Sequence, residues 1–177
     1  PILYYRNNIV SLLNLLELMP KHNVDGIVFS SSCTVYGEPD TNPIDETAPI
    51  KVAASPYGNT KQINEEIIQD FAKSGASIKS IIFNPIGAHP TAEIGELPIG
   101  VPQNLVPYIT QTGIGVREQL SVFGDDYETP DGSCIRDFIN VVDLAKAHVI
   151  AVNRMLENKS NEQVEIFNLG TGNGVSV

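Results

Sequence analysis

GIVFSSSCTVYG, residues 26–37, and SPYGNTK, residues 55–61, decide the fold of this chain. The first begins with a short apolar run rich in β-branched residues, which is typical of a buried strand in a parallel sheet. The second begins with a serine and a proline, which favour the first turn of a helix. A strand, a polar connection and a helix in this order make up part of a βαβ unit, so the stretch predicts an α/β fold with a parallel sheet.

The same alternation extends to both sides. The helix that starts at Ser55 is expected to reach Lys73 and to end at Gly75. Its apolar face is expected to contain Ile63, Ile67 and Phe71, and its wetter side Glu65 and Glu66. Other helices are expected over residues 7–19, 104–112 and 142–155. Strands are expected over residues 26–30, 78–83, 120–123, 138–141 and 165–168.

The composition excludes two classes of protein. The 177 residues carry a formal net charge of −10, whereas a protein that follows nucleic-acid phosphates needs a basic face, so we expect no nucleic-acid partner. No apolar stretch approaches the roughly 18 residues that span a bilayer, so we expect no membrane partner. Cys33 and Cys134 match no metal or redox spacing, so we expect no metal and a reduced, cytoplasmic compartment.

Tyr57 and Lys61 are the candidate catalytic pair. A spacing of four on a helix places both side chains on one face. A tyrosine hydroxyl with a pKa of about 10 is a poor base at neutral pH, but a neighbouring ammonium favours the phenolate and lowers that pKa. The pair therefore suits general acid–base chemistry on a secondary alcohol. The alternative is two unrelated surface side chains, because this spacing is common by chance.

Three serines, Ser30, Ser31 and Ser32, close the strand expected over residues 26–30. Ligands of open parallel sheets bind beyond the carboxyl ends of the strands. A serine hydroxyl at this edge is placed to reach the same substrate oxygen as Tyr57. The alternative is that the hydroxyls only cap the loop that follows.

Several segments, in order and with consistent spacing, match the motifs of one known family. Residues 29–37 resemble SSSATVYG and residues 55–61 resemble SPYGxSK. The other matches are residues 83–90 to FNPxGAHP, 100–105 to GIPNNL, 123–132 to FGxDYxxxDG, 135–141 to VRDYIHV and 168–172 to NLGxG. These are motifs of the UDP-glucose (UDP-galactose) 4-epimerases, which belong to the extended short-chain dehydrogenase/reductase family.

The resemblance implies NAD-dependent interconversion of UDP-galactose and UDP-glucose through a 4-keto intermediate, a reaction of galactose metabolism. In that family the tyrosine takes the proton of the sugar 4-hydroxyl while hydride leaves C4 for NAD, and the hydride returns to the other face of the 4-keto sugar. Carried over, Tyr57 is the acid and base, and Ser32 supports proton transfer at O4. Lys61 holds the nicotinamide ribose and lowers the pKa of Tyr57.

The resemblance also implies which residues bind the cofactor and the substrate. NAD contacts are implied for Asn7, Ser30, Ser31, Tyr57, Lys61 and Pro85. UDP-sugar contacts are implied for Ser32, Phe83, Asn84, Asn104, Leu105, Phe123 and Arg136. Phe123 matches a position beside the uracil and Arg136 a position on the diphosphate, which suits a guanidinium. Without the family context, Arg136 is as readily a salt-bridge partner of Asp137.

The implied fold is an incomplete NAD-binding Rossmann-type parallel sheet with part of a smaller, mixed substrate-binding region. Residues 1–85 are expected to form the C-terminal part of the Rossmann domain. Residues 86–177 are expected to form mainly the substrate-binding region, with segments that return to the sheet. The glycine-rich GxxGxxG fingerprint is absent, so we expect a central fragment of a longer protein that is inactive alone. The family often forms dimers through the Tyr-Lys helix, so a homodimer is possible.

Three other functions stay open from the sequence. A sugar-nucleotide 4,6-dehydratase would share the Tyr-Lys pair but needs an Asp-Glu pair where Cys33 and Thr34 stand. Epimerases of other UDP-sugars differ partly in residues outside this chain. A non-catalytic remnant that binds a nucleotide or a partner protein fits the missing fingerprint and the sequence IIFN, residues 81–84, where the family has RYFN.

Overall fold

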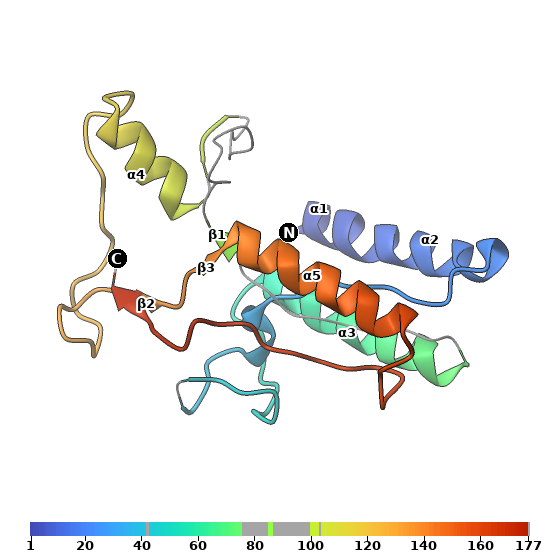
Figure 1. Ribbon diagram of the computed structural model, residues 1–177. Helices are drawn as coiled ribbons and strands as arrows, with labels where there is room; N and C mark the ends of the chain where they lie inside the picture. The colour runs from blue at the N-terminus through green and yellow to red at the C-terminus, as the bar shows by residue number, and fades with distance from the viewer. Residues whose placement is uncertain (42, 76–84, 87–99, 103, 177) are drawn as a thin grey trace. The chain divides into compact units, whose positions relative to one another are not determined.

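The computed structural model of the chain describes residues 1–41, 43–75, 85–86, 100–102 and 104–176 (Figure 1). The chain forms two compact units. The first contains Pro1–Asn84 and Lys146–Leu169, and the second contains Pro85–Ala145 and Gly170–Val177. That these regions serve NAD and the sugar substrate, respectively, stays a prediction.

The first unit opens with one long helical run. It consists of α1 (Ile2–Tyr5), the π-helical turn η1 (Arg6–Val10) and α2 (Ser11–Leu18), followed by the 3-10 turn η2 (Pro20–His22). The helix predicted over residues 7–19 is thus confirmed but begins at Ile2, because no residue between Pro1 and the predicted start breaks a helix. Asn23 ends the run in the left-handed conformation, with φ of 54°.

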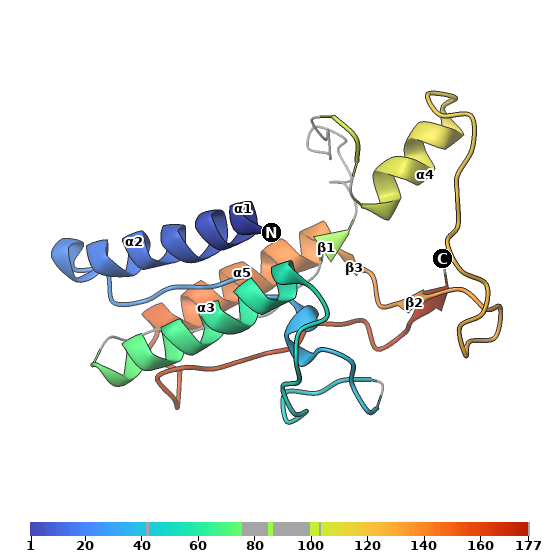
Figure 2. The same ribbon diagram turned by 180° about the vertical axis from the view of Figure 1, so that it is seen from behind.

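Helix α3 (Pro56–Lys73) confirms the second predicted helix. Ser55 caps it as expected, because its hydroxyl accepts a hydrogen bond from the Gly58 N–H at 3.1 Å. Figures 1 and 2 show α3 beside the run from α1 to α2. A hydrogen bond links α3 to α1, because Asn59 Nδ2 donates to the Tyr5 hydroxyl at 2.8 Å.

The buried face of α3 differs from the predicted one. Its buried residues are Gly58, Thr60, Asn64, Glu65, Ile68 and Ala72. The predicted stripe of Ile63, Ile67 and Phe71 is only half-buried, and placing Glu65 on the wetter side is wrong, although Glu66 is exposed. The reason is that α3 contacts two elements, the α1–η1 run and the 3-10 turn η3 (Cys33–Tyr36), so its buried arc is wider than one stripe.

Two apolar clusters stabilise this unit. Leu12, Leu16 and Met19 of the first helical run pack with Ile68 and Ala72 of α3, and residues 27, 29, 67, 71 and 164 cover the edge of this cluster. Val35 and Tyr36 form the second cluster, which is covered by residues 44, 48 and 166. A fully buried aliphatic side chain contributes about 1.5–3 kcal/mol, so the first cluster accounts for the pairing of the two helices.

The strands were predicted less accurately than the helices. Residues 26–30 and 165–168 are extended, but only Ser30 and Asn168 form a bridge to another segment. An extended segment becomes a strand only when a neighbour is hydrogen-bonded along it, and the strand predicted over residues 78–83 lies outside the described residues. The strand predicted over residues 120–123 is wrong, since that segment is irregular and Phe123 is 85% exposed.

In the second unit, β1 (Pro85–Ile86) pairs in parallel with β3 (Ile139–Asn140), with Pro85 opposite Ile139. The strand predicted over residues 138–141 is therefore confirmed in shortened form. It ends where α5 (Val141–Leu156) begins, because Asn140 Oδ1 accepts a hydrogen bond from the Val142 N–H at 2.8 Å.

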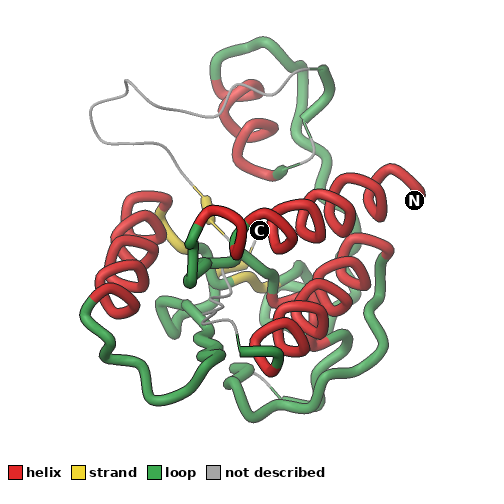
Figure 3. The backbone as a smooth tube through the Cα atoms, turned by 90° about the vertical axis from the view of Figure 1, so that its right-hand side faces the viewer, coloured by secondary structure: helices red, strands yellow, loops and turns green. Residues whose placement is uncertain are grey.

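The remaining elements of the second unit are short. Helix α4 (Leu105–Gly113) confirms the helix predicted over residues 104–112. The antiparallel pair β2 (Ile135–Arg136) and β4 (Val175–Ser176) was not predicted, because two-residue strands leave no periodic pattern. Figure 3 shows how much of the described chain is helical or irregular. None of the helices in the described ranges is long and apolar enough to cross a membrane.

Candidate active site

Tyr57 and Ser32 meet at the start of α3. Ser32 caps the turn η3, with its hydroxyl accepting from the Thr34 N–H at 3.3 Å and from the Thr34 hydroxyl at 3.0 Å. The Tyr57 and Ser32 side chains are hydrogen-bonded to each other. Ser32 is 1% exposed and Tyr57 is half-buried, with the edge of the Tyr4 ring 6.0 Å away between ring centres. The predicted acid–base tyrosine and its supporting serine are therefore brought together.

Lys61 completes the group one helical turn later. Its Nζ donates a hydrogen bond of 2.8 Å to the Ser30 carbonyl. The same ammonium lies 5.0 Å from the centre of the Phe29 ring and 5.6 Å from that of Tyr57. At these distances both rings attract the charge through their faces. The segment that ends in the three serines thus holds Lys61 through Ser30 and Tyr57 through Ser32.

The proton affinities in this group are governed by burial. Burial raises the pKa of Tyr57 above its ordinary value, and the hydrogen bond from Ser32 offsets this only in part. Burial lowers the pKa of Lys61, and the nearby Glu65 carboxylate opposes that effect. The direction for Tyr57 is opposite to the lowering expected from Lys61, because the ammonium is bonded to a carbonyl and not to the phenol. Tyr57 thus stands in this structure as a protonated hydroxyl that can donate.

A cavity of about 360 Å³ opens beside Lys61, between the first helical run and α3. Polar groups of Asn8, Ser11, Lys61 and Asn64 line it, together with apolar side chains of residues 12, 15 and 27–29. Asn8 Nδ2 donates to Thr60 Oγ1 at 2.9 Å, and the Asn8 carbonyl accepts from Asn64 Nδ2 at 3.2 Å.

The two neighbouring asparagines, Asn7 and Asn8, lie in different environments. Asn7, which was predicted to lie near NAD, is exposed, whereas Asn8 faces α3. Both belong to the π-helical turn η1, a rare conformation that recurs at functional sites. Asn8 and Asn64 were not predicted as site residues, and the doubled asparagine was the only signal in the sequence for the first of them.

The other two serines point in different directions. Ser30 Oγ lies 2.9 Å from His148 Nε2 on α5, so His148 supports this segment from the opposite side, in line with a structural role. Ser31 is 2% exposed, and its Oγ has no hydrogen-bond partner among the residues that the structure describes. The hydroxyl lies next to Glu65, whose pKa it lowers.

The predicted substrate residues of the second unit form a separate set. Arg136 in β2 is exposed and donates to the Ile135 carbonyl at 2.9 Å. Asp137 does not pair with it within the described part of the chain. The Asp137 carboxylate instead accepts from the Thr171 N–H at 3.0 Å, the Thr171 hydroxyl at 2.7 Å and the Gly172 N–H at 3.0 Å. The salt-bridge alternative for Arg136 is therefore not supported.

The remaining predicted residues are distributed as follows. Asn104 precedes α4 and is exposed, Leu105 opens that helix and is half-buried, and Phe123 lies in an irregular exposed segment. Pro85 lies in β1. Phe83 and Asn84 fall outside the described residues, so their predicted contacts stay untested.

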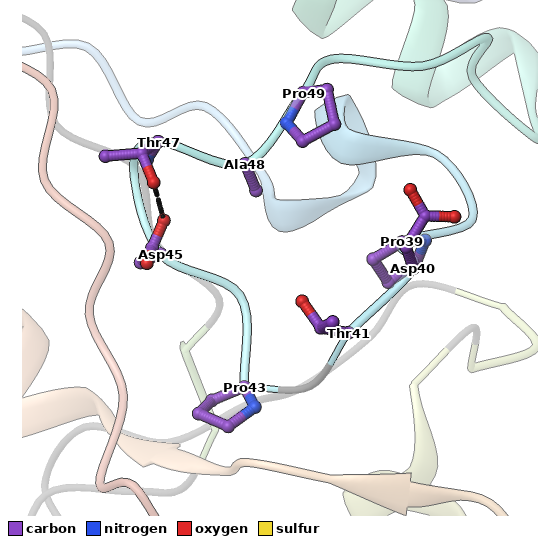
Figure 4. A pocket seen from close by; sticks show the side chains of 8 residues that line it. All are labelled: Pro39, Asp40, Thr41, Pro43, Asp45, Thr47, Ala48 and Pro49. Atoms are coloured by element: carbon purple, nitrogen blue, oxygen red, sulfur yellow. Dashed lines mark hydrogen bonds between the residues drawn. The ribbon is translucent and has the colours of Figure 1, made fainter.

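A second cavity, of about 240 Å³, is formed by the loop from Pro39 to Pro49 (Figure 4). Thr47 closes one side by donating to Asp45 Oδ1 at 2.6 Å. None of the predicted site residues lines it. Among the described residues, no cluster of His, Cys, Asp and Glu side chains is arranged to hold a metal ion.

The helices, the extended segments and the parallel β1–β3 pair are those of an α/β protein. The sequence pattern of the NAD dependent epimerase/dehydratase family matches residues 1–170, so the chain belongs to this family. The predicted fold class and the resemblance found in the sequence are thereby confirmed.

Known proteins are similar to this chain along its whole length. UDP-glucose 4-epimerase of Dictyostelium discoideum is 52% identical over 180 residues, covering 100% of this chain and 52% of that protein. The enzyme of Bacillus subtilis (strain 168) is 49% identical with the same coverage. The crystal structure of UDP-glucose 4-epimerase from Bifidobacterium longum in complex with NAD+ and UDP has a TM-score of 0.91 and 46% identity, covering 99% of this chain and 52% of that one. The chain spans about half the length of these relatives.

Proposed function

We propose that the protein containing this chain interconverts UDP-galactose and UDP-glucose through a 4-keto intermediate. The observation that carries the proposal is the group of Ser32, Tyr57 and Lys61, in which the tyrosine is hydrogen-bonded to the serine and lies beside the ammonium. The relatives named UDP-glucose 4-epimerase support it, because this chain matches them over its full length.

NAD, when bound, accepts a hydride from C4 of the sugar and returns it. The cavity beside Lys61 fits the nicotinamide end of such a cofactor. The Lys61 ammonium and the Asn8 and Asn64 amides offer donors for ribose hydroxyls, and Phe29 offers an apolar wall. We assign this half of the cofactor to the cavity, with Asn7, Ser30, Ser31 and Pro85 as further predicted contacts.

Tyr57 performs the proton transfer in this proposal. In the phenolate form its oxygen takes the proton of the sugar 4-hydroxyl, and it gives that proton back to the sugar oxygen when the hydride returns to C4. Because burial raises the pKa of Tyr57, the phenolate needs support. Ser32 supplies a hydrogen bond and Lys61 a positive charge, both of which favour the anionic form.

UDP-sugar binding is assigned to Ser32 and to the other residues for which the resemblance implies it. The predicted contacts are Phe83, Asn84, Asn104, Leu105, Phe123 and Arg136. Arg136 is suited to the diphosphate because its guanidinium is exposed and Asp137 is engaged elsewhere. Asp137 contributes indirectly by fastening residues 171 and 172 next to the strand that carries Arg136.

Two other activities found in this family can be weighed against specific observations. A 4,6-dehydratase is disfavoured, because Cys33 and Thr34 replace the acidic pair that water elimination requires. Acceptance of N-acetylated sugars is the second candidate. A crystal structure of the UDP-Glc/GlcNAc 4-epimerase from Campylobacter jejuni is 34% identical, with a TM-score of 0.76 over 99% of this chain.

Two broader expectations accompany the proposal. We propose a homodimer, since several large apolar side chains of the first helical run are exposed, among them Leu13 and Leu18. We propose a cytoplasmic location, since neither Cys33 nor Cys134 forms a disulfide within the described residues, and a reducing compartment preserves thiols. Sedimentation of the purified protein tests the first and cell fractionation the second.

The experiment for the proposed function is purification of the protein that contains this chain, followed by release and assay of bound nicotinamide cofactor. Incubation with UDP-galactose is expected to yield UDP-glucose, detected by chromatography of the nucleotide sugars. A parallel reaction with UDP-N-acetylgalactosamine tests whether the protein also accepts N-acetylated sugars. A protein that holds no nicotinamide and converts no UDP-hexose would contradict the proposal.

A further inference from the structure

Glu65 is a buried acidic side chain that the proposed chemistry leaves unused. It lies on α3 one helical turn after Lys61 and is only 3% exposed. Its Oε1 atom has no hydrogen-bond partner within the described ranges. Burying a carboxyl group without full hydrogen bonding is unfavourable, so a purely structural position would be better filled by an apolar residue.

Three polar groups act on Glu65, namely Ser31 and Tyr36 from outside α3 and Lys61 on the same helix. The Ser31 hydroxyl and the Lys61 ammonium both lower its pKa, while burial, the largest effect, raises it. The Tyr36 hydroxyl of η3 donates a hydrogen bond to Asn168 Oδ1 at 3.0 Å, and the Glu65 charge contributes to raising the pKa of Tyr36 after the larger effect of burial. Ser31 Oγ and Glu65 Oε1 are both buried without a hydrogen bond of ordinary geometry among the described residues, so the carboxyl group faces this hydroxyl in a dry environment.

Ser31 stands between the two residues that hold the candidate catalytic side chains. The carbonyl of Ser30 accepts the hydrogen bond from Lys61, and the hydroxyl of Ser32 is bonded to Tyr57. Glu65 lies beside Ser31 and one helical turn after Lys61, so it is placed to act on both halves of the site.

We propose that Glu65 is a positioning residue that acts through Ser31 and Lys61 to fix the three-serine segment and the lysine ammonium relative to Tyr57. The kinetic consequences rest on the proposed function, whereas the coupling between Glu65 and Lys61 does not. The Glu65 carboxylate raises the pKa of Lys61 against the effect of burial, and so keeps the ammonium charged to higher pH.

The first test measures this coupling directly. Glu65→Gln keeps the shape and an acceptor for Ser31 but removes the charge, and Glu66→Gln is the matched control on the exposed neighbour. Lysines are reductively methylated with ¹³C, which retains their charge, and are titrated by NMR, with Lys61→Arg identifying the Lys61 signal. The Lys61 signal is expected to titrate at lower pH in Glu65→Gln than in wild type, and at the wild-type pH in Glu66→Gln. The same titration in Glu65→Gln and wild type would overturn the proposal.

The second test measures the effect on turnover. Glu65→Gln and Ser31→Ala are each expected to lower kcat about tenfold, with an unchanged KM for UDP-galactose, because the site is misplaced but the substrate contacts remain. The decrease in kcat of the double variant is expected to be smaller than the product of the fold-decreases of the two single variants. The reason is that both substitutions break the same contact. The alkaline limb of the pH–rate profile is expected at lower pH in Glu65→Gln.

Full activity of Glu65→Gln, or a double variant whose losses multiply, would contradict the proposal. If Glu65→Gln does not fold, Ser31→Ala decides, because it removes the hydroxyl and leaves the carboxyl group in place; a wild-type rate in that variant overturns the inference. A wild-type protein without epimerase activity would refute the proposed function, and the NMR titration would still decide the role of Glu65.

Discussion

At Tyr57, Lys61 and Glu65 the largest influence on the pKa is burial, which favours the neutral form of each side chain. The three groups lie within two turns of one helix, so each charge that forms there is stabilised mainly by the other groups and by Ser31 and Ser32. Such an environment suits a hydroxyl that transfers a proton. In it, a few neighbouring groups determine the free-energy difference between the phenol and the phenolate.

Gly37 shows how a single backbone position shapes the loop between η3 and α3. Its φ is +62°, and a Cβ placed there would lie 2.6 Å from the Val52 carbonyl oxygen. Gly37→Ala is therefore expected to destabilise the protein by about 2–4 kcal/mol, through both the left-handed conformation and the overlap. The measurement is urea unfolding.

Gly75 is the matched control for that substitution. Its φ is +106°, and a Cβ there would meet no atom of the described residues within 4 Å. Gly75→Ala isolates the backbone contribution, which is expected to cost about 1–2 kcal/mol. Equal losses in the two variants would show that the contact with Val52 has no energetic weight.

At the scale of elements, helix α3 depends on its cap. Ser55→Ala removes the acceptor for the Gly58 N–H and is expected to cost about 1 kcal/mol of stability. Ser55→Asp restores an acceptor of good capping geometry and is expected to retain most of it. Thermal unfolding followed by circular dichroism checks the pair; a fully stable Ser55→Ala would mean that the helix start is held by its packing alone.

The end of α5 is fastened to the segment that follows it by an ion pair that responds to pH. Arg154 Nε and Nη2 each donate at 2.8 Å to the Glu165 carboxylate, which lowers the Glu165 pKa to about 2. Because the folded-state pKa is depressed below the ordinary 4.5, the stabilisation is complete above that value and is lost as the pH falls toward about 2.

Glu165→Gln is accordingly expected to lower the unfolding temperature by several degrees at neutral pH, and the difference from wild type is expected to vanish near pH 2. The matched control is Glu157→Gln, which breaks the exposed pair with Lys159 and is expected to change little. A difference between Glu165→Gln and wild type that stays constant from neutral to acidic pH would contradict the assigned ion pair.

For the whole molecule, the features that could be predicted are those with local signals. Ser55 and Pro56 announce the start of α3, and the spacing of Tyr57 and Lys61 follows from the helix itself. Glu65 was misplaced, because α3 packs against η3 as well as against the first helical run, and η3 comes from a region distant in sequence. Asn8 was overlooked for a related reason: whether it or Asn7 faces α3 depends on the π-helical turn, which no local signal announces.

Strands were harder to predict than helices for a physical reason. A helix satisfies its own backbone hydrogen bonds, whereas a strand depends on a neighbour that is remote in sequence. Residues 26–30 and 165–168 have the composition of strands but are bridged only at Ser30 and Asn168 in the described chain. The resemblance to a known family, carried by motifs along nearly the whole sequence, predicted the fold class more securely than any single element did.

The central claim is that Tyr57 transfers the proton at the sugar 4-hydroxyl. The most direct measurement compares the rate of UDP-galactose conversion by wild type, Tyr57→Phe and the control Tyr4→Phe, whose ring contacts Tyr57 from an exposed position. Tyr57→Phe is expected to lose about 10²–10⁴-fold in kcat while binding of the UDP-sugar is largely retained, and Tyr4→Phe is expected to stay near wild type. A Tyr57→Phe protein that turns over at the wild-type rate would remove Tyr57 from the mechanism and contradict the account.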